Sequence, residues 1–493
     1  MTGVGSCIVL CMATELLDPV ARPHGVPGFR RSLIAMPFRL LPVVFVFALA
    51  LGTTGSPVTA VAVTIVLLLA VVIGSNVKRR ILGEPLLFTD FAIVGEMVRH
   101  PGFYLGAISP VARVGLACAL TTMAWLLIRG SSGAATWPVA IWPRAVGIAV
   151  ALSCWPLMHR LALIAPWRRL MTEPAIDADL AAHGLLATLS LYWLRWRRQP
   201  DPRPLPNPAI ACGPNAAELV VVVQCESFAD PALLGPALAA RAPDLPGLAR
   251  ARARAVRWGN LAVGGFGAYT MRTEHGVLFG REEDSLGFRR FDPFLTASGD
   301  RSAALPERLS GWIRNALFVH PHDLSFYGRD RLMPAIGFNV LVGHDAFVDA
   351  TRRGPHVADA VLADRLEALI RDAVEPTLIY AVTIENHGPW KAGRLDKGGS
   401  GLDAYLDHLQ SGDALLIRLI DCLEADGRRA VLAFFGDHRP SIPGVVEPGS
   451  GRDTPFVVLR FGGQAGTRDQ PAAERLTPAG LHHTILHVAS GVG

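Results

Sequence analysis

Hydrophobic residues follow two different patterns along the chain, and the change near residue 200 divides the sequence into two parts. Before it, apolar runs interrupted by few charges approach the length that a helix needs to cross a bilayer core. After it, short apolar runs typical of buried strands alternate with longer amphipathic segments typical of helices. The pattern predicts a transmembrane helical domain over residues 1–198 and a second domain of α/β class over 216–493.

Four segments of the first part predict membrane-spanning helices: 40–53, 58–77, 114–128 and 145–163. A fifth crossing is predicted either at 5–20 or at 181–194, and the second of these equally fits an amphipathic helix on the membrane surface. The segment 79–97, between the second and third predicted helices, is expected to be a surface or re-entrant element or a plain connecting loop.

Basic residues mark alternate ends of the four predicted helices. They are Arg30, Arg31 and Arg39, then Lys78, Arg79 and Arg80, then Arg160, Arg168 and Arg169. By the positive-inside rule this places the N-terminus in the cytoplasm, and four crossings would then leave the C-terminal part there as well. A fifth crossing would reverse its side, and the sequence leaves both arrangements open.

Proline recurs through residues 199–215, which predicts an extended linker because repeated proline prevents both helix and central strand. Beyond it we expect a mostly parallel sheet covered by helices on both faces. Its predicted strands are 219–224, 316–319, 377–383, 431–435 and 455–459. Its predicted helices are 305–314, 357–373 and 402–425.

Composition narrows the class of protein. The chain has 493 residues, 18% of them charged, and a mean hydropathy of +0.33, which agrees with a membrane domain. The net charge is +5, but the arginines lie at the ends of apolar runs and form no basic stripe, so nucleic acid is not an expected partner. Seven cysteines without CxxC spacing exclude a zinc site, and at most one disulfide is expected, between Cys212 and Cys225 or Cys422.

Polar residues with metal-binding chemistry directly follow two predicted strands. Strand 219–224 leads into Glu226, and strand 431–435 leads into Asp437 and His438. Parallel strands end at one edge of a sheet, so these side chains are expected to meet there. Two carboxylates and an imidazole suit a divalent cation such as manganese or magnesium.

The loop between them, GGFGAYTMRTEHGVLFG at 264–280, presents Thr270 as a nucleophile. A threonine hydroxyl attacks only when a base or a metal ion helps to remove its proton, so Thr270 is expected to be a fourth metal ligand. Thr273 and Glu274 are expected to orient the loop.

These residues resemble the lipoteichoic acid synthase and phosphoglycerol transferase family, membrane-anchored members of the alkaline phosphatase and sulfatase superfamily. VVQCES, TMRTE and FFGDH match the segments in which that family holds one metal ion, usually manganese. HPHDLSFYGRD is similar to its headgroup-binding stretch, which implies that His320, Tyr327 and Arg329 bind phosphoglycerol. TIENHGPW is similar to the segment that would place His387 beside the reacting phosphorus, and the GEPLLFTD loop extends the likeness into the membrane part.

The resemblance implies a multi-pass protein of the cytoplasmic membrane whose C-terminal domain faces the periplasm or the cell exterior. It further implies transfer of glycerophosphate from phosphatidylglycerol, through a phosphothreonine, to an envelope glycan or a polyglycerolphosphate chain. Structural alternatives remain: His320 as a buried structural histidine, Tyr327 as a packing residue, and Arg329 paired with Asp330 or Asp323 in a surface network.

Other functions are also consistent with parts of the sequence. A phosphoethanolamine transferase or a hydrolytic phosphodiesterase would use the same residues. The formylglycine motif C/S-x-P-x-R of authentic sulfatases is absent from the sequence. A membrane sensor with an inactive domain would be expected to lack a metal ligand, and a transporter would be expected to bury charges within its helices.

Overall fold

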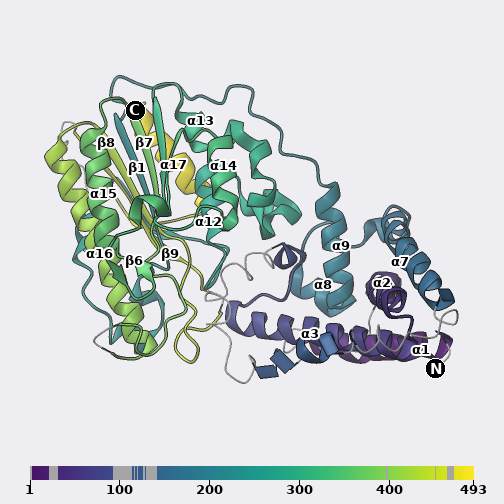
Figure 1. Ribbon diagram of the computed structural model, residues 1–493. Helices are drawn as coiled ribbons and strands as arrows, with labels where there is room; N and C mark the ends of the chain where they lie inside the picture. The colour runs from purple at the N-terminus through teal and green to yellow at the C-terminus, as the bar shows by residue number, and fades with distance from the viewer. Residues whose placement is uncertain are drawn as a thin grey trace. The chain divides into compact units, whose positions relative to one another are not determined.

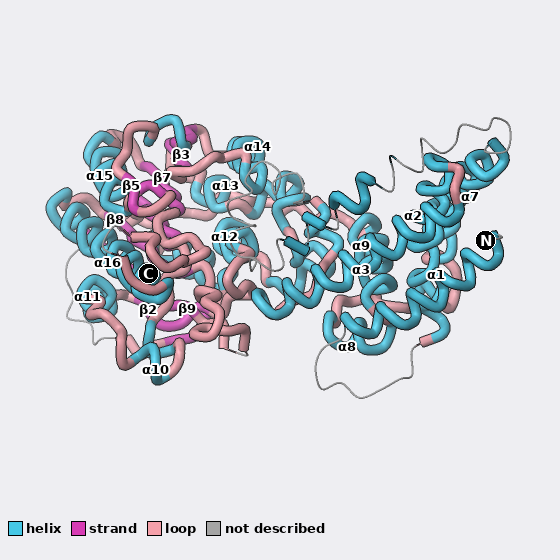
Figure 2. The backbone as a smooth tube through the Cα atoms, turned by 60° about the horizontal axis from the view of Figure 1, so that its bottom comes forward, coloured by secondary structure: helices cyan, strands magenta, loops and turns pink. Residues whose placement is uncertain are grey.

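The structure is a computed structural model, and it describes residues 3–21, 32–92, most positions between 114 and 128, and 141–492 except 396–397, 450 and 463–470. It forms two compact units, Met1–Gln199 and Pro200–Gly493. Figure 2 shows that strands occur only in the second unit, whereas the described part of the first unit consists of helices and loops.

The N-terminal unit contains three described helices that are long and apolar enough to cross a membrane, within Leu33–Thr54, Pro57–Leu82 and Ile141–Leu161. They correspond to three of the four predicted crossings. The described positions of the predicted crossing 114–128 are helical, and the rest of it lies outside the described residues. The helices of this unit whose bounds are fully described are α1 (Gly3–Leu17), η1 (Asp18–Ala21), η2 (Leu33–Ala35), α2 (Met36–Thr54), α3 (Pro57–Leu82), η3 (Phe88–Phe91), α7 (Ile141–Leu161), η4 (Trp167–Arg169), α8 (Ile176–His183) and α9 (Leu185–Arg198).

Small residues let α2 and α7 approach each other closely. A Cβ atom added at Gly147 would lie 2.5 Å from the backbone nitrogen of Gly52 and 2.6 Å from the carbonyl oxygen of Ala48. Helices in membranes associate through such contacts because lipid tails remove the hydrophobic drive for burying larger apolar side chains.

A buried charged network joins α1, α2 and α9. Arg39 is 1% exposed and donates to Glu15 Oε1 and to the carbonyl oxygens of Ser32 and His183. Asp18 Oδ1 accepts from the backbone N–H of Leu186 in the first turn of α9. The acidic residues of the segment 5–20 therefore hold helices together.

The C-terminal unit is built on an eight-stranded sheet in the order β10-β2-β9-β8-β1-β7-β3-β4, in which β9 runs antiparallel to both of its neighbours. This confirms the predicted mostly parallel α/β sheet. Figure 1 shows α15 and α16 on one face, with α12, α13 and α17 on the other. The strands are β1 (Leu219–Cys225), β2 (Arg257–Leu261), β3 (Asn315–Val319), β4 (Val340–Val342), β5 (Arg352–Arg353), β6 (His356–Val357), β7 (Thr377–Val382), β8 (Ala430–Gly436), β9 (Thr454–Phe461) and β10 (Glu474–Leu476).

The helices of this unit pack their apolar faces on the sheet, and the longest, α16, begins with a capping box in which Ser400 and Asp403 bond each other's backbone N–H groups. The α-helices are α10 (Pro236–Ala239), α11 (Pro246–Arg254), α12 (Thr270–Phe279), α13 (Leu305–Leu309), α14 (Arg329–Ala335), α15 (Asp359–Asp372), α16 (Gly401–Asp426) and α17 (Pro478–Ser490). The 3-10 helices are η5 (Pro231–Leu233), η6 (Glu283–Phe291), η7 (Pro293–Leu295), η8 (Ala297–Ala303), η9 (Phe326–Gly328) and η10 (His344–Phe347).

The central strands set the position of the site. All seven residues of β1 and all seven of β8 are buried, and the two strands pair in parallel with Cys225 opposite Gly436. The residues that follow this last pair, Glu226 and Asp437, therefore leave the sheet at the same level on neighbouring strands.

Candidate metal and phosphotransfer site

Glu226, Asp437 and His438 form a buried cluster at the carboxyl ends of β1 and β8. One ligand atom from each lies within 4.8 Å of the others, and no second such group occurs within the described residues. His438 Nε2 lies 3.3 Å from Glu226 Oε1 and 3.5 Å from Asp437 Oδ2. The arrangement joins two carboxylates and one imidazole around a single point.

The hydrogen bonds of Asp437 leave one of its oxygens available for a cation. Oδ1 accepts from the backbone N–H groups of Ser227 and His438, both at 2.8 Å, whereas the buried Oδ2 has no hydrogen-bond partner. A buried oxygen without a donor is costly unless an ion or another group satisfies it. The donor set and this oxygen together fit a divalent metal ion.

The electrostatics of the cluster also favour a cation. Burial and the negative charge of Glu226 raise the pKa of Asp437 to about 7. Burial alone would lower the pKa of His438, but the charges of Asp437 and Glu226 raise it to about 9. Two carboxylates this close repel each other in the protein interior, and a divalent ion would offset that repulsion.

Thr270 is the first residue of α12 and is 6% exposed. The Thr270 hydroxyl lies close enough to Asp437 to lower the pKa of that carboxyl slightly against the effect of burial, which places the hydroxyl beside the metal cluster. Two further bonds tie its loop to the same strand end: Gly267 N–H donates to Arg439 O, and Thr273 Oγ1 donates to Asp437 O at 2.7 Å.

Backbone strain concentrates around this site. Four described residues other than glycine have positive φ, and three of them are Ser227 (φ 52°), Tyr269 (φ 74°) and Tyr327 (φ 60°). Ser227 follows Glu226 and Tyr269 precedes Thr270, so both flank residues of the cluster. A side chain held in this region costs about 1–3 kcal/mol, and such strain is typical of functional sites.

His387 lies in the loop after β7, where several side chains hold the backbone in place. Its Nδ1 lies 2.6 Å from Gly388 O, an acceptor, so Nδ1 carries a proton. Arg394 donates to the carbonyl oxygens of Glu385 and His387 at 2.7 and 2.6 Å. The Glu385 carboxylate, fully buried, accepts from His408 Nδ1 at 2.7 Å and from Arg353 Nη1 at 3.1 Å.

His387 and His320 are held neutral at physiological pH. Burial lowers the pKa of His387 against the attraction of Glu226, and burial together with Arg329 lowers the pKa of His320 well below its ordinary value. In both rings Nδ1 faces a backbone carbonyl oxygen and carries the proton, so the neutral ring presents Nε2 as a hydrogen-bond acceptor.

Arg329 does not belong to a surface network with Asp330 or Asp323, which was the structural alternative. It is 2% exposed and binds Glu274 as a fork, with Nε 3.1 Å from Oε1 and Nη2 2.5 Å from Oε2. Its guanidinium also lies 5.3 Å from the ring centre of Tyr327. Glu274 is itself fully buried, so this is an internal ion pair, and Nη1 is the nitrogen that Glu274 does not engage.

Replacing Arg329 by leucine is expected to destabilise the protein by about 3–5 kcal/mol, because Glu274 would keep a buried charge without a partner. The double variant Arg329→Leu/Glu274→Leu should recover most of that stability. If Arg329 also binds the substrate phosphate, the double variant will remain inactive. Chemical denaturation and a phosphotransfer assay on both variants separate the two roles, and recovery of activity in the double variant would exclude phosphate binding by Arg329.

Two histidines at the site were not singled out from the sequence. The ring centre of His322 lies 5.8 Å from that of His320, and the ring centre of His356 lies 5.7 Å from that of His387. His322 stands in the same HPHD segment as His320, so its spacing was a usable signal. His356 comes from the hairpin β5–β6, and nothing in the local sequence pattern indicates its position.

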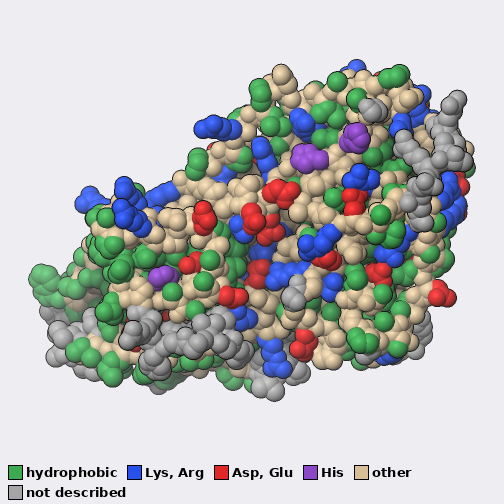
Figure 3. Space-filling model, turned by 180° about the vertical axis from the view of Figure 1, so that it is seen from behind, with side chains coloured by type: hydrophobic (Ala, Val, Ile, Leu, Met, Phe, Trp, Pro, Cys, Tyr) green, Lys and Arg blue, Asp and Glu red, His purple; other side chains and the backbone are tan. Residues whose placement is uncertain are grey.

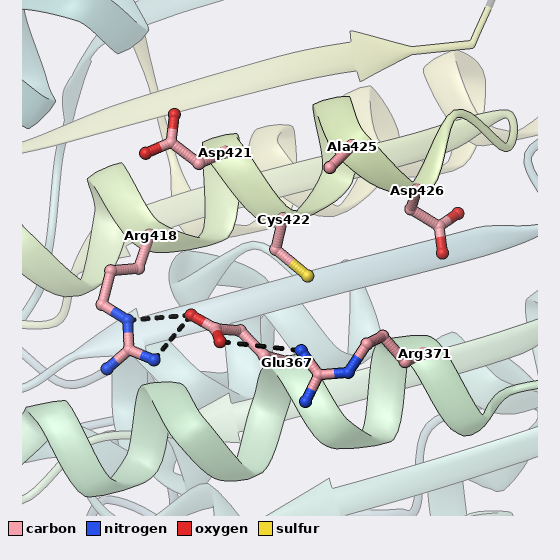
Figure 4. Close-up of a pocket in the computed structure, with 7 residues that line it drawn as sticks. All are labelled: Glu367, Arg371, Arg418, Asp421, Cys422, Ala425 and Asp426. Atoms are coloured by element: carbon pink, nitrogen blue, oxygen red, sulfur yellow. Dashed lines mark hydrogen bonds and ion pairs between the residues drawn. The ribbon is translucent and has the colours of Figure 1, made fainter.

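A groove between α15 and α16 lies far from the metal cluster and is not part of the candidate site. It is lined by Glu367, Arg371, Arg418, Asp421, Cys422, Ala425 and Asp426 (Figure 4). These residues lie in the last turns of helices that lead into β7 and β8, so the groove is at the edge of the sheet opposite the metal cluster. Glu367 pairs with Arg418 at 2.7 Å and with Arg371 at 3.8 Å, so the charged side chains of the groove neutralise one another.

The disulfide considered between Cys212 and Cys225 or Cys422 does not form. All three cysteines carry free thiols.

Comparison with known proteins identifies the family of the C-terminal unit and a relative similar along almost the whole chain. The family described as Sulfatase matches residues 218–492, more than half of the chain. The capsular polysaccharide biosynthesis protein RkpI of Rhizobium meliloti (strain 1021) is 28% identical over 98% of this chain and 94% of its own length. A putative cyclic beta-1,2-glucan modification protein of the same strain is 24% identical over 52% of this chain and 40% of its own length.

One solved structure matches both units in order along the chain. The integral membrane lipooligosaccharide phosphoethanolamine transferase A (EptA) of Neisseria meningitidis has a TM-score of 0.57 and 14% identity, and the match covers 99% of this chain and 95% of that one. At this identity the likeness shows the fold, a helical N-terminal region followed by an α/β domain.

Proposed function

Because the chain belongs to the sulfatase family, we propose that it is a membrane-anchored, metal-dependent phosphotransferase that uses Thr270 as its nucleophile. It moves glycerophosphate from phosphatidylglycerol to an envelope glycan or a polyglycerolphosphate acceptor. The observation that carries this proposal is the threonine hydroxyl at a helix N-terminus, beside a buried cluster of three metal-ligand side chains.

Glu226, Asp437 and His438 would hold the metal ion, with Thr270 completing the set. When bound, such an ion lowers the pKa of a hydroxyl and stabilises negative charge on phosphate oxygens. Manganese is the ion we favour, and magnesium suits the same ligands. Ser227 and His438 fix the orientation of Asp437 through their backbone N–H groups, so the ligand oxygen is preorganised.

The reaction proceeds in two displacements at phosphorus. In the first, Thr270 Oγ1 forms a bond to phosphorus and loses its proton, while the bond from phosphorus to the diacylglycerol oxygen breaks and that oxygen takes up a proton. In the second, an acceptor hydroxyl loses its proton and bonds to phosphorus, while the bond from phosphorus to Thr270 Oγ1 breaks and that oxygen takes up a proton. Arg329 Nη1 would donate a charged hydrogen bond to the phosphate oxygens. The neutral rings of His387 and His320 give their Nδ1–H to the carbonyl oxygens of Gly388 and Val382, so their Nε2 atoms would accept hydrogen bonds from hydroxyls of the headgroup or the acceptor. Tyr327 would pack beside the headgroup.

The names of the relatives support a glycan acceptor. One is a capsular polysaccharide biosynthesis protein and the other a putative glucan modification protein, so both names connect this kind of sequence with envelope polysaccharides. A second candidate is transfer of phosphoethanolamine, favoured by the match to EptA over almost the whole chain. The two candidates use the same nucleophile and differ in the donor headgroup.

Mass spectrometry of the full-length protein after incubation with a lipid donor and manganese tests the proposal. Phosphatidylglycerol is expected to leave a glycerophosphate adduct on the peptide that contains Thr270. An adduct only from phosphatidylethanolamine would establish the second candidate. A metal-loaded protein that forms no adduct with either lipid would contradict a covalent phosphotransferase of this kind.

The reaction on an outer-leaflet lipid requires the C-terminal unit to face the periplasm or the cell exterior. The N-terminal unit then anchors the enzyme in the cytoplasmic membrane. A reporter enzyme fused after Gly493 is expected to be active only outside the cytoplasm, and activity confined to the cytoplasm would contradict this orientation.

A further inference from the structure

Basic residues from separate elements of the N-terminal unit converge at one end of it. Trp167 Nε1 donates to Ile34 O at 2.7 Å, which joins the segment after α7 to the start of α2. Arg198 donates to His159 O at 2.7 Å, which joins the end of α9 to the end of α7. On its visible face Figure 3 shows Lys and Arg side chains gathered along the upper edge of this unit, at the left of the view.

Arginine and tryptophan side chains line this end. The rings of Trp155 and Trp193 lie 4.6 Å apart, and the guanidinium of Arg197 lies 5.5 Å from the ring centre of Trp193. Arg195 holds the end of α9 in place by donating to three carbonyl oxygens of residues 167–170, between 2.8 and 3.0 Å. The surface is therefore built on a fixed backbone.

Four exposed arginines here have no carboxylate partner within the described part of the chain: Arg160, Arg168, Arg169 and Arg197. Several exposed arginines of the C-terminal unit are paired instead: Arg257 with Glu474, Arg301 with Glu307 and Arg475 with Asp453. We call these four residues with Trp155 and Trp193 the arginine–tryptophan surface.

Apolar side chains continue from the arginine–tryptophan surface toward the membrane-spanning length of α7. Trp155 is 49% exposed, Leu163 57% and Ile164 52%. Tryptophan with arginine at the end of an apolar helix is typical of the level of lipid headgroups. The surface thus presents positive charge at headgroup depth and apolar contacts beside it.

The position of this charge is unusual under the proposed orientation. The chain passes from α9 directly into the C-terminal unit, so the end of α9 lies on the same side of the membrane as that unit. The positive-inside rule disfavours a concentration of arginines on the outer side. A requirement for negatively charged headgroups at that surface would account for it, because the proposed donor lipid is an anion.

We infer that the arginine–tryptophan surface is a binding site for anionic phospholipid headgroups. It holds phosphatidylglycerol-like lipids, in preference to zwitterionic ones, on the side of the membrane where the phosphotransfer site would use them. This inference rests on the proposed function for its orientation argument, but the binding itself requires no chemistry at Thr270.

Lipid retention tests the inference. The full-length protein is reconstituted in nanodiscs of equal parts phosphatidylglycerol and phosphatidylethanolamine, extracted into mild detergent, and its retained lipids are counted by native mass spectrometry. Wild type is expected to retain phosphatidylglycerol preferentially. The variant Arg160→Gln/Arg168→Gln/Arg169→Gln is expected to lose roughly 100-fold of that preference, since each of the three arginines near an anionic surface contributes roughly fivefold.

A matched variant removes the same charge elsewhere. Arg203, Arg314 and Arg365 are exposed in the C-terminal unit, and the triple glutamine variant at these positions should retain lipids as wild type does. Equal retention of both lipids by wild type, or an unchanged preference in the Arg160/168/169 variant, would overturn the inference. Displacement of the lipid by free glycerol phosphate would overturn it as well, because it would show a site for soluble phosphate.

The outcome is separable from that of the proposed function. The variant Thr270→Ala should keep the lipid preference, since Thr270 belongs to the C-terminal unit. Preferential retention without any adduct on Thr270 would contradict the proposed reaction and support the lipid site. An adduct on Thr270 without preferential retention would do the reverse.

Discussion

The variant Thr270→Ala is expected to lose at least about 10³-fold of the phosphotransfer rate and to form no covalent adduct. The methyl side chain cannot attack phosphorus, and the neighbouring Thr273 hydroxyl is already engaged with the carbonyl oxygen of Asp437. The rate is measured as release of diacylglycerol from labelled phosphatidylglycerol by the purified protein in lipid nanodiscs. Metal binding should persist, because Glu226, Asp437 and His438 remain.

Two substitutions act as controls for this result. Thr270→Ser keeps a hydroxyl and should restore adduct formation, at a reduced rate. Thr484, on α17, donates its hydroxyl to Gly480 O within its own helix, so Thr484→Ala should behave as wild type. A Thr270→Ala protein that binds metal and still releases diacylglycerol at the wild-type rate would show that another group, or water, is the nucleophile.

The variant Asp437→Asn is expected to reduce manganese affinity by at least about 10²-fold and to abolish phosphotransfer. An amide lacks the negative charge that the ion requires. Because Oδ1 accepts two backbone N–H groups, the amide nitrogen would take the place of Oδ2, the oxygen without a hydrogen-bond partner. Thermal unfolding with added manganese measures the effect. At 100 times the dissociation constant, wild type gains about 2.7 kcal/mol of stability, and the variant should gain almost none.

Without metal, the same substitution should raise the stability of the folded protein near neutral pH relative to wild type. The pKa of Asp437 in the folded, metal-free protein is raised to about 7, above its ordinary value near 4, so the folded state holds a proton that the unfolded chain releases. Its contribution to stability is present at low pH and is lost as pH rises from about 4 to 7. Asp437→Asn removes that dependence, so the metal-free variant should lose less stability than wild type as pH rises from about 4 to 7.

A buried carboxylate outside the cluster provides the comparison. Burial raises the pKa of Asp359 as well, but Asp359 is not among the metal-ligand side chains. Asp359→Asn should therefore keep the stabilisation by manganese. If Asp437→Asn were stabilised by manganese as strongly as wild type, the ion would have to bind elsewhere.

The central sheet could be predicted because its strands are short apolar runs buried on both faces. The predicted strand 431–435 became β8 (Ala430–Gly436), and 455–459 became β9 (Thr454–Phe461). The antiparallel direction of β9 could not be read from its sequence, because a buried strand has the same pattern in either direction. The edge strand β2 (Arg257–Leu261) was not predicted, since its pattern mixes arginine, glycine and asparagine with apolar residues.

Residues that come after strands were easier to place than residues whose partners are distant in sequence. The ligand candidates Glu226 and Asp437 follow paired positions of two parallel strands, and strand order brings them together. The partner of Arg329, Glu274, lies 55 residues away on a different helix, and no local spacing indicates it. His356 reaches His387 through a two-stranded hairpin too short to predict.

In the N-terminal unit the elements themselves could be predicted, whereas the contacts between them could not. Helix length and hydropathy predict α2 and α3 well, since the bilayer imposes both. Contacts between helices depend on small residues such as Gly52 and Gly147 and on the Arg39 network, and these leave no periodic signal. The sequence therefore predicts spans but not how they pack.

The pairing of β1 with β7 on one side and β8 on the other has a consequence for partial unfolding. Amide protons of a strand flanked on both sides exchange with solvent only when the whole domain opens, whereas edge strands open more readily. Glu226 and Asp437 directly follow this slow-exchanging centre of the sheet. Local opening of the edge strands β4 and β10 would therefore leave these two carboxylates paired at their strand ends.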